Sequence, residues 1–106
     1  MASTYCVTFR VADIVVGGKT YNERRQSIVD AVKTKGLGYW EETTSFFLVE
    51  SSFDTVSFTK AASKGLSASH DMLAAFDPSD MSVAYFGAIE HPDVLASFFQ
   101  TAKRLP

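Results

Sequence analysis

Apolar and polar side chains alternate at the start of the chain. The apolar members of residues 4–11 are Tyr5, Val7, Phe9 and Val11. Because the side chains of a strand point to its two faces in turn, this period of two predicts a β-strand with one buried face. The glycine pair Gly17-Gly18 follows and predicts a loop.

A helical period begins after this loop. Thr20 and Glu23 have the spacing of a capping box, so a helix is predicted to start there. The inward stripe of this helix consists of Tyr21, Arg25, Ile28, Val29 and Val32. Gly36 and Gly38 are predicted to end the helix, and its stripe needs a sheet or a second helix to cover it.

The middle of the chain predicts strands and a second helix. Residues 39–50 are rich in aromatic and β-branched side chains, and their polar middle indicates either two strands or one long bent strand. The run Phe46-Phe47-Leu48-Val49 is almost continuously apolar, as expected of a strand that is covered on both faces. A second helix is predicted from a cap at Ser51 or Ser52 to about Lys64, before Gly65.

The last third predicts a helix, a strand and a final helix. Residues 66–76 are interpreted as a short helix with Leu73 and Phe76 facing inward. Asp77-Pro78-Ser79-Asp80 has turn chemistry, and residues 81–89 are interpreted as the last strand. Pro92 is expected in the first turn of the final helix. The apolar stripe of that helix consists of Val94, Leu95, Phe98, Phe99 and Ala102.

This order of elements predicts an α+β protein with a single domain over residues 1–106. Strand, helix, strand, strand, helix, strand is the split βαβ order of ferredoxin-like domains, here with an extra C-terminal helix. Such a βαββαβ sandwich has a four-stranded antiparallel sheet with two helices on one face. The other face needs a cover, which we expect from the terminal helix and from a second subunit.

Composition limits the kinds of partner that are expected for this chain. Nine phenylalanines among 106 residues supply more bulky apolar surface than is usual, which favours a homodimer through the sheet face or edge. The net charge of −2 does not favour binding to a nucleic acid. The single cysteine, Cys6, is interpreted as a small apolar strand residue. With no leader and no long apolar run, a cytoplasmic protein without membrane contact is expected.

Few residues suggest metal or cofactor chemistry. His70 and His91 lack the spacing of a zinc site and are interpreted as surface or capping residues. Asp71, Asp77 and Asp80 are acidic, but an Asp-Pro-Ser-Asp segment is more typical of a turn whose carboxylates bind the local backbone. Neither a cofactor nor a metal is predicted, and no catalytic residue is assigned.

Five residues are candidates for binding a ligand. Arg24 and Arg25, together with Arg10, place positive charge where a phosphate could bind. Tyr39 and Trp40 are candidates for stacking on a base. The alternatives are a solvated helix face for the arginines and a packing or interface role for the aromatic pair.

The first strand also resembles a known family. Val7-Thr-Phe-Arg-Val11 is similar to the Val-Thr-Tyr-Asp-Leu strand that opens members of a small family, which includes the CRISPR-associated spacer-acquisition endoribonuclease and virulence-associated protein D. Tyr39-Trp40, Ser45-Phe-Phe-Leu-Val49 and Asp77-Pro-Ser-Asp80 resemble later motifs of that family. The resemblance implies a homodimer built through the sheets.

One position in the same resemblance argues against the family's nuclease activity in this chain. Nuclease members carry a metal-binding Asp where this chain has Arg10, and an arginine repels Mg²⁺. The favoured hypothesis is therefore a non-catalytic, homodimeric ferredoxin-like protein with a scaffolding or binding role. The alternatives are a metal-dependent endoribonuclease that uses Asp13 or the Asp77/Asp80 turn, and a binding module for a small molecule or nucleic acid.

Overall fold

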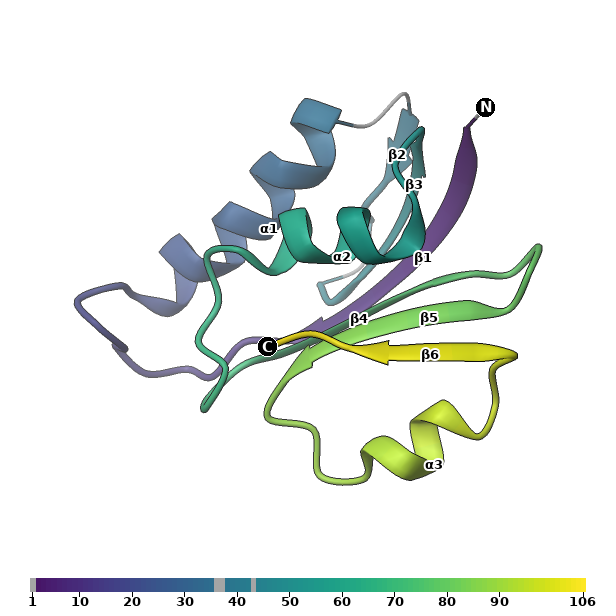
Figure 1. Cartoon of the computed structure of the whole chain (residues 1–106). Helices are drawn as coiled ribbons and strands as arrows, with labels where there is room; N and C mark the ends of the chain where they lie inside the picture. Colours follow the sequence, from purple (N-terminus) through teal and green to yellow (C-terminus); the bar gives the residue numbers. More distant parts are fainter. Residues whose placement is uncertain (1, 36–37, 43) are drawn as a thin grey trace.

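The structure is a computed structural model that describes residues 2–35, 38–42 and 44–106. Over these residues the chain forms one six-stranded sheet in the order β2-β3-β1-β4-β5-β6, with three helices (Figure 1). The strands are β1 (Ser3–Arg10), β2 (Gly38–Trp40), β3 (Phe46–Ser51), β4 (Met72–Asp77), β5 (Ser82–Gly87) and β6 (Thr101–Arg104). The helices are α1 (Tyr21–Lys35), α2 (Thr55–Ser63) and α3 (Pro92–Ala96). None of the described helices is long and apolar enough to span a membrane.

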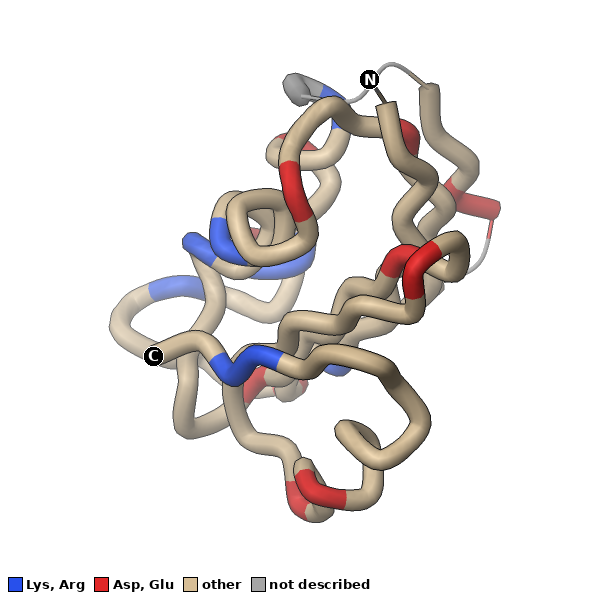
Figure 2. Tube along the Cα trace, turned by 45° about the vertical axis from the view of Figure 1, so that its right-hand side comes forward, with Lys and Arg blue, Asp and Glu red and all other residues tan. Residues whose placement is uncertain are grey.

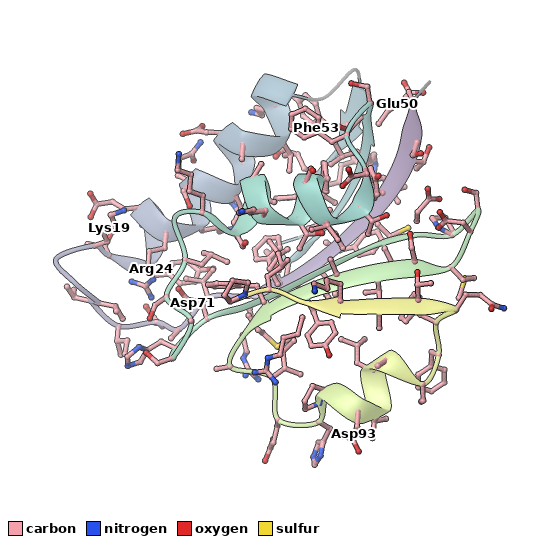
Figure 3. All side chains as sticks on the ribbon, viewed as in Figure 1. Lys19, Arg24, Glu50, Phe53, Asp71 and Asp93 are labelled. Atoms are coloured by element: carbon pink, nitrogen blue, oxygen red, sulfur yellow. The ribbon has the colours of Figure 1, made fainter. Side chains whose placement is uncertain are left out.

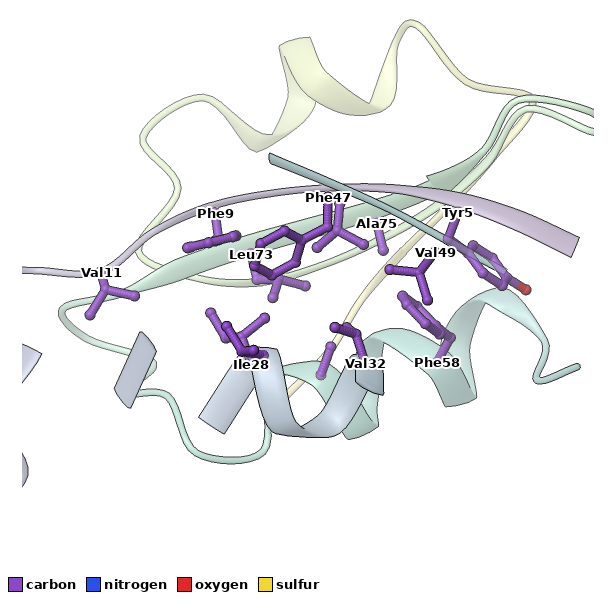
Figure 4. Packing of buried hydrophobic residues seen from close by; sticks show 13 residues of the cluster. Tyr5, Phe9, Val11, Ile28, Val32, Phe47, Val49, Phe58, Leu73 and Ala75 are labelled. Carbon is purple, nitrogen blue, oxygen red and sulfur yellow. The ribbon is translucent and has the colours of Figure 1, made fainter. Parts of the chain in front are cut away.

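The inner face of the sheet carries the main core, under α1 and α2 (Figure 4). The alternation predicted for residues 4–11 is confirmed, because Tyr5, Val7, Phe9 and Val11 are all buried. The Tyr5 ring stacks on Phe58 of α2 with centroids 4.4 Å apart. Burial of such large side chains is the main favourable term for the fold.

Helix α1 begins as predicted. The Glu23 amide donates to Thr20 Oγ1 at 3.1 Å, and the Thr20 amide donates to Glu23 Oε1 at 2.9 Å. This reciprocal pair is the capping box. The predicted stop at Gly36 lies outside the described residues.

Helix α2 has the predicted end but a different start. It ends at Ser63 with Lys64 as its C-cap. Its N-cap is Asp54, whose carboxylate accepts from the Ser57 amide at 2.7 Å, so the prediction of Ser51 or Ser52 is wrong. Ser51 instead lies buried at the end of β3, where its hydroxyl accepts from the Phe53 amide at 3.2 Å.

The predicted helix over residues 66–76 is wrong, because the segment ends in strand β4. Leucine, methionine and alanine are good helix formers, but β4 is hydrogen-bonded to β1 on one side and to β5 on the other. Hydrogen bonding to two neighbouring strands outweighs the weak preference of these residues for a helix. Leu73 still faces the inner core, as expected, and is fully buried. Phe76, also expected to face inward, instead lies on the other face of the sheet, opposite Cys6.

The C-terminal region also departs from the prediction. The expected long final helix is the short α3, and the chain then returns as β6, which pairs in parallel with β5. Ala102, expected in the helical stripe, lies opposite Val83 in this ladder. The sheet consequently has six strands instead of the expected four, and it is not entirely antiparallel.

Candidate functional site

The outer face of the sheet, opposite α1 and α2, is the candidate functional surface. Side chains of paired residues in neighbouring strands point to the same face, so the register gives two rows that cross the sheet. The first row is Trp40, Leu48, Cys6, Phe76, Val83 and Ala102. The second row is Phe46, Thr8, Ala74, Tyr85 and Arg104.

One half of this outer face, formed by β4, β5 and β6, is covered by the chain itself. Leu95 and Phe99, from α3 and the turn after it, pack against a small second core that contains Val83. The rings of Phe76 and Phe99 have centroids 5.2 Å apart. Figure 1 shows α3 beside β5 and β6, on the side of the sheet away from α1 and α2.

The other half of the outer face, formed by β2, β3 and β1, is exposed. We name it the open half and define it by the side chains of Trp40, Leu48, Cys6 and Thr8. Trp40 is 39% exposed and Leu48 is 37% exposed. A shallow hollow of about 340 Å³ borders both residues. The continuous apolar run in β3 predicted cover on both faces, and for Leu48 this prediction is wrong within the single chain.

Acidic side chains border the open half. Glu42 follows β2, and its carboxylate accepts a hydrogen bond from Trp40 Nε1 at 2.7 Å. Glu50 lies opposite Thr4 at the other end of β3 and is exposed. A negative border of this kind disfavours a polyanionic ligand.

The outer face also carries two arginines, Arg10 at the end of β1 and Arg104 on the edge strand β6. A terminal nitrogen of Arg104 donates to the Gly87 carbonyl at 3.2 Å, and its guanidinium lies 5.9 Å from the centre of the Tyr85 ring. Arg10 donates to the Ala88 carbonyl at 3.4 Å. Within the described residues neither arginine forms an ion pair. Both therefore remain available to a carboxylate from outside the chain.

The predicted ligand residue Arg24 is instead part of the core. It is 1% exposed, and its Nε donates to Asp71 Oδ2 at 2.9 Å (Figure 3). Its terminal nitrogens donate to the carbonyls of Ala12, Ile14 and Lys19 at 2.6, 2.9 and 2.7 Å. With every donor in use, Arg24 has nothing left to offer a ligand.

Asp71 is the matching buried acid. Its oxygens also accept from the amides of Ala12 and Ser67, each at 2.9 Å. Burial alone would raise the pKa of Asp71, but the hydrogen bonds from Arg24 and from these two amides outweigh it, and the pKa is lowered. The pair thus ties the loop after β1 to the loop before β4 as a charged unit.

The other predicted ligand residues are not brought together. Arg25 donates through Nε to the Thr44 carbonyl at 3.1 Å, and its guanidinium lies 5.8 Å from the centre of the Phe9 ring. Tyr39 is paired with the buried Val49 and therefore lies on the inner side of the sheet, whereas Trp40 lies on the outer side. The two aromatic rings therefore cannot stack together on one base.

The acids considered as metal ligands and His70 make local contacts, and His91 is the N-cap residue of α3 without a side-chain capping bond. Asp77 Oδ1 accepts from the Ser79 amide at 2.9 Å, and Asp80 Oδ1 accepts from the Ser82 amide at 2.9 Å, as in a turn. His70 Nδ1 lies 3.0 Å from the Ser69 hydroxyl. In the part of the chain that the structure describes, no three His, Cys, Asp or Glu side chains gather as a metal site.

Cys6 lies half-buried on the outer face, at the centre of the first row. Burial raises the pKa of its thiol, and the negative charge of Asp77 adds to the effect. A raised pKa keeps the thiol protonated and so makes it a poor nucleophile. This agrees with its interpretation as a small apolar strand residue.

Sequence reasoning missed the Arg24–Asp71 pair and the border charges of the outer face. A signal for the first was present, because Arg24, Ile28 and Val32 are spaced four residues apart and so share one helix face. No comparable signal marked Glu42 and Arg104, whose places depend on strand pairing. The chain is thus an α+β protein with a half-covered outer sheet face, and it matches no known family model, curated protein or solved structure.

Proposed function

We propose that this chain is a non-catalytic, ferredoxin-like protein that acts as a homodimer in scaffolding or partner binding, with the open half as its dimer interface. The order β2-β3-β1-β4, with antiparallel neighbours, supports the ferredoxin-like part. On this view β5, α3 and β6 are an addition at one edge of the sheet. The sequence resemblance to a dimeric family supports the same proposal.

The observation that carries the proposal is that the apolar sequence of β3 and its exposure in the single chain do not agree. Its sequence is that of a strand covered on both faces, yet Leu48 is 37% exposed in the single chain. Next to it, Trp40 is 39% exposed, which is a large aromatic surface for a protein of this size. A second copy on this surface would complete the burial that the sequence pattern requires.

Charge and contacts argue against the two alternatives. Glu42 and Glu50 border the open half and would repel a nucleic acid. Among the candidate acids, Asp71 is bound to Arg24, and Asp77 is bound within its turn. The position that corresponds to the family's metal-binding Asp is Arg10, whose positive charge repels a divalent metal.

The homodimer is tested by the mass of the protein in solution. At micromolar concentration, light scattering on a sizing column should give twice the chain mass of 11.6 kDa. Leu48→Glu should give the monomer with an unchanged circular dichroism spectrum, because it buries a charge in the interface. Val56→Glu is the matched control, since Val56 is 38% exposed but lies on α2, and it should remain dimeric. A monomeric wild-type protein would refute the proposed homodimer.

The absence of catalysis is tested with single-stranded RNA and Mg²⁺ or Mn²⁺. The wild-type protein should cleave no more than an Asp13→Ala variant, because Asp13 is the exposed acid nearest to the end of β1. Metal-dependent cleavage that Asp13→Ala abolishes would show that the protein is a nuclease after all.

A further inference from the structure

We infer that Arg10 and Arg104 together form a binding site for a phosphate monoester group, on the outer face of the sheet at the end of β5. This inference is separate from the proposed homodimer, because neither arginine is among the side chains that define the open half. It follows from where the two guanidiniums are held, from the donors that they leave unused, and from the charge around them.

Strand pairing brings the two arginines to the same side of the sheet. Arg10 is the last residue of β1, and its alternation with the buried Phe9 places its side chain on the outer face. Arg104 is the last residue of β6 and lies opposite Tyr85, whose side chain belongs to the second core on that face. Because β5 lies between β6 and the pair β1-β4, the two side chains approach the end of β5 from opposite sides.

The ends of both side chains are held at consecutive residues. Arg10 donates through Nη2 to the Ala88 carbonyl at 3.4 Å, and Arg104 donates through Nη2 to the Gly87 carbonyl at 3.2 Å. Because consecutive Cα atoms are about 3.8 Å apart, the two guanidiniums converge on one short stretch of backbone. The Tyr85 ring, with its centre 5.9 Å from the Arg104 guanidinium, helps to hold that side chain in place. One small ligand can therefore contact both arginines.

Most hydrogen-bond donors of this arginine pair are unused. Within the described residues each of the two guanidiniums donates a single hydrogen bond, and both side chains are exposed. The remaining N–H groups form planar forks that fit the oxygens of a phosphate or a carboxylate. Arg24 is the opposite case, because its donors are taken by Asp71 and by carbonyl groups of the chain. The exposed pair thus has the donors that a ligand needs.

The arginine pair also lacks a counter-charge in the part of the chain that the structure describes. Asp13 and Glu90 are the acids nearest to it along the chain, and neither lies within 4.0 Å of an arginine of the pair. Asp77 and Asp80 belong to the turn at the other end of β5. Figure 2 shows this separation between the basic positions of β6, toward the C-terminus, and the acidic positions of that turn. Two positive charges held close together repel each other, and a bound anion removes that repulsion.

The charge of the pair favours a phosphate monoester over other oxyanions. At neutral pH such a group carries a charge of about −1.5 to −2 and has three acceptor oxygens, enough for both guanidiniums. A carboxylate carries a single charge, as does each phosphodiester of a nucleic acid, and the net charge of −2 disfavours a long polyanion. The group that matches the site is therefore one phosphate monoester, on a small molecule or on a phosphorylated side chain of a partner protein.

Titration with inorganic phosphate provides the test, with the backbone amide signals of Gly87 and Ala88 followed by nuclear magnetic resonance. At a pH of about 8, where a phosphate group carries close to two charges, both signals should shift and reach saturation. Acetate at the same ionic strength should bind at least about tenfold more weakly, because it brings a single charge to two arginines.

Variants of the two arginines locate the site. Arg10→Gln and Arg104→Gln should each raise the dissociation constant for phosphate at least about tenfold, because each removes charge-assisted hydrogen bonds. Both residues are exposed, so the circular dichroism spectrum should not change. Lys103→Gln is the matched control, because it removes the same charge from the exposed neighbour of Arg104, which lies opposite Ala84 on the other face. Its dissociation constant should stay within about twofold of wild type.

Phosphoserine, free and within a peptide, distinguishes the two sources of the group. A peptide that binds at least about tenfold more tightly than free phosphoserine supports the site and indicates a phosphorylated protein partner, because residues around the phosphate then add contacts. Equal binding of the two probes supports the site and indicates a small molecule.

Four results would overturn the inference. They are amide signals of Gly87 and Ala88 that do not saturate with inorganic phosphate, equal affinity for acetate, binding that neither arginine variant weakens, and a loss in Lys103→Gln as large as in Arg104→Gln. The last result would show that the positive charge at the end of β6 attracts the anion without a defined site. A monomeric wild-type protein would overturn the homodimer alone, since the phosphate titration does not depend on it.

Discussion

Loss of the buried Arg24 side chain should be among the most destabilising single changes in this protein. Arg24→Met keeps much of the apolar stem but removes the guanidinium that binds Asp71 through Nε at 2.9 Å. The Asp71 carboxylate is 0% exposed and would remain buried, held only by the amides of Ala12 and Ser67. An uncompensated buried charge is the main cost of this change.

The expected magnitude follows from the burial of both partners. Removing one member of a buried ion pair costs about 3–5 kcal/mol. The carbonyls of Ala12, Ile14 and Lys19 also lose their donor. Ile14 and Lys19 are exposed, so water replaces the guanidinium there at little further cost, whereas Ala12 is half-buried and its carbonyl adds to the loss. Domains of this kind are stable by about 5–15 kcal/mol, so the loss is a large share of the total free energy of unfolding. The melting temperature should fall by about 4–8 °C for each kcal/mol lost.

The assay is urea unfolding followed by circular dichroism at pH 7. Arg25→Met is the matched control, because it makes the same chemical change at the next residue of α1, where the side chain is only half-buried. It should cost about 1 kcal/mol or less. In Arg24→Met combined with Asp71→Asn, the loss should be smaller than the sum of the two single losses, because no buried charge is then left without a partner.

Two results would refute this reasoning. Asp71→Asn, which keeps the size of the side chain, supplies a second measurement of the same pair if Arg24→Met does not fold. If both variants lose no more stability than Arg25→Met, the ion pair does not hold the loops together. Additive losses in the double variant would show that Arg24 and Asp71 act independently.

Three further predictions concern stability. Because the pKa of Asp71 is lowered from 3.8, its contribution is complete above that pH and is lost as the pH falls through the lower folded value, so the free energy of unfolding should fall in acid and should fall less steeply in Asp71→Asn. Gly87→Ala should cost more than about 1 kcal/mol, because φ is 97° and a Cβ would collide with the Asp71 carbonyl oxygen, whereas Gly38→Ala, with open space around it, should be close to neutral. Tyr5→Phe should cost about 1 kcal/mol by removing the 2.6 Å hydrogen bond to the Phe53 carbonyl, and an unchanged midpoint in urea would contradict that value.

In the proposed homodimer, which joins the open halves on the outer faces of the two sheets, α1 and α2 lie on the surfaces that point away from the interface. The helices α1 and α2 would then be the surfaces left for a scaffolding partner. Lys60 and Lys64 of this surface border a hollow of about 320 Å³ near the C-terminus. The dimer interface and the partner-binding surface would thus be on opposite faces of each sheet.

The sequence by itself determined the elements whose signals are local. The alternation from Tyr5 to Val11 defined β1, and the Thr20/Glu23 pair defined the start of α1. Such signals are read within a few residues, because side-chain direction and capping depend on the immediate backbone. The Asp77–Asp80 turn belongs to the same group.

Only the tertiary structure decided the features that depend on distant partners. Residues 72–76 form a strand because β1 and β5 pair with them, although a short apolar run does not distinguish strand from helix. Arg24 is buried because Asp71, forty-seven positions later, supplies its counter-charge. Residues 101–104 leave the helical pattern because the edge of β5 accepts them. The open half of the outer face could not be predicted from the sequence either, because the length of α3 decides how much of the sheet one chain can cover.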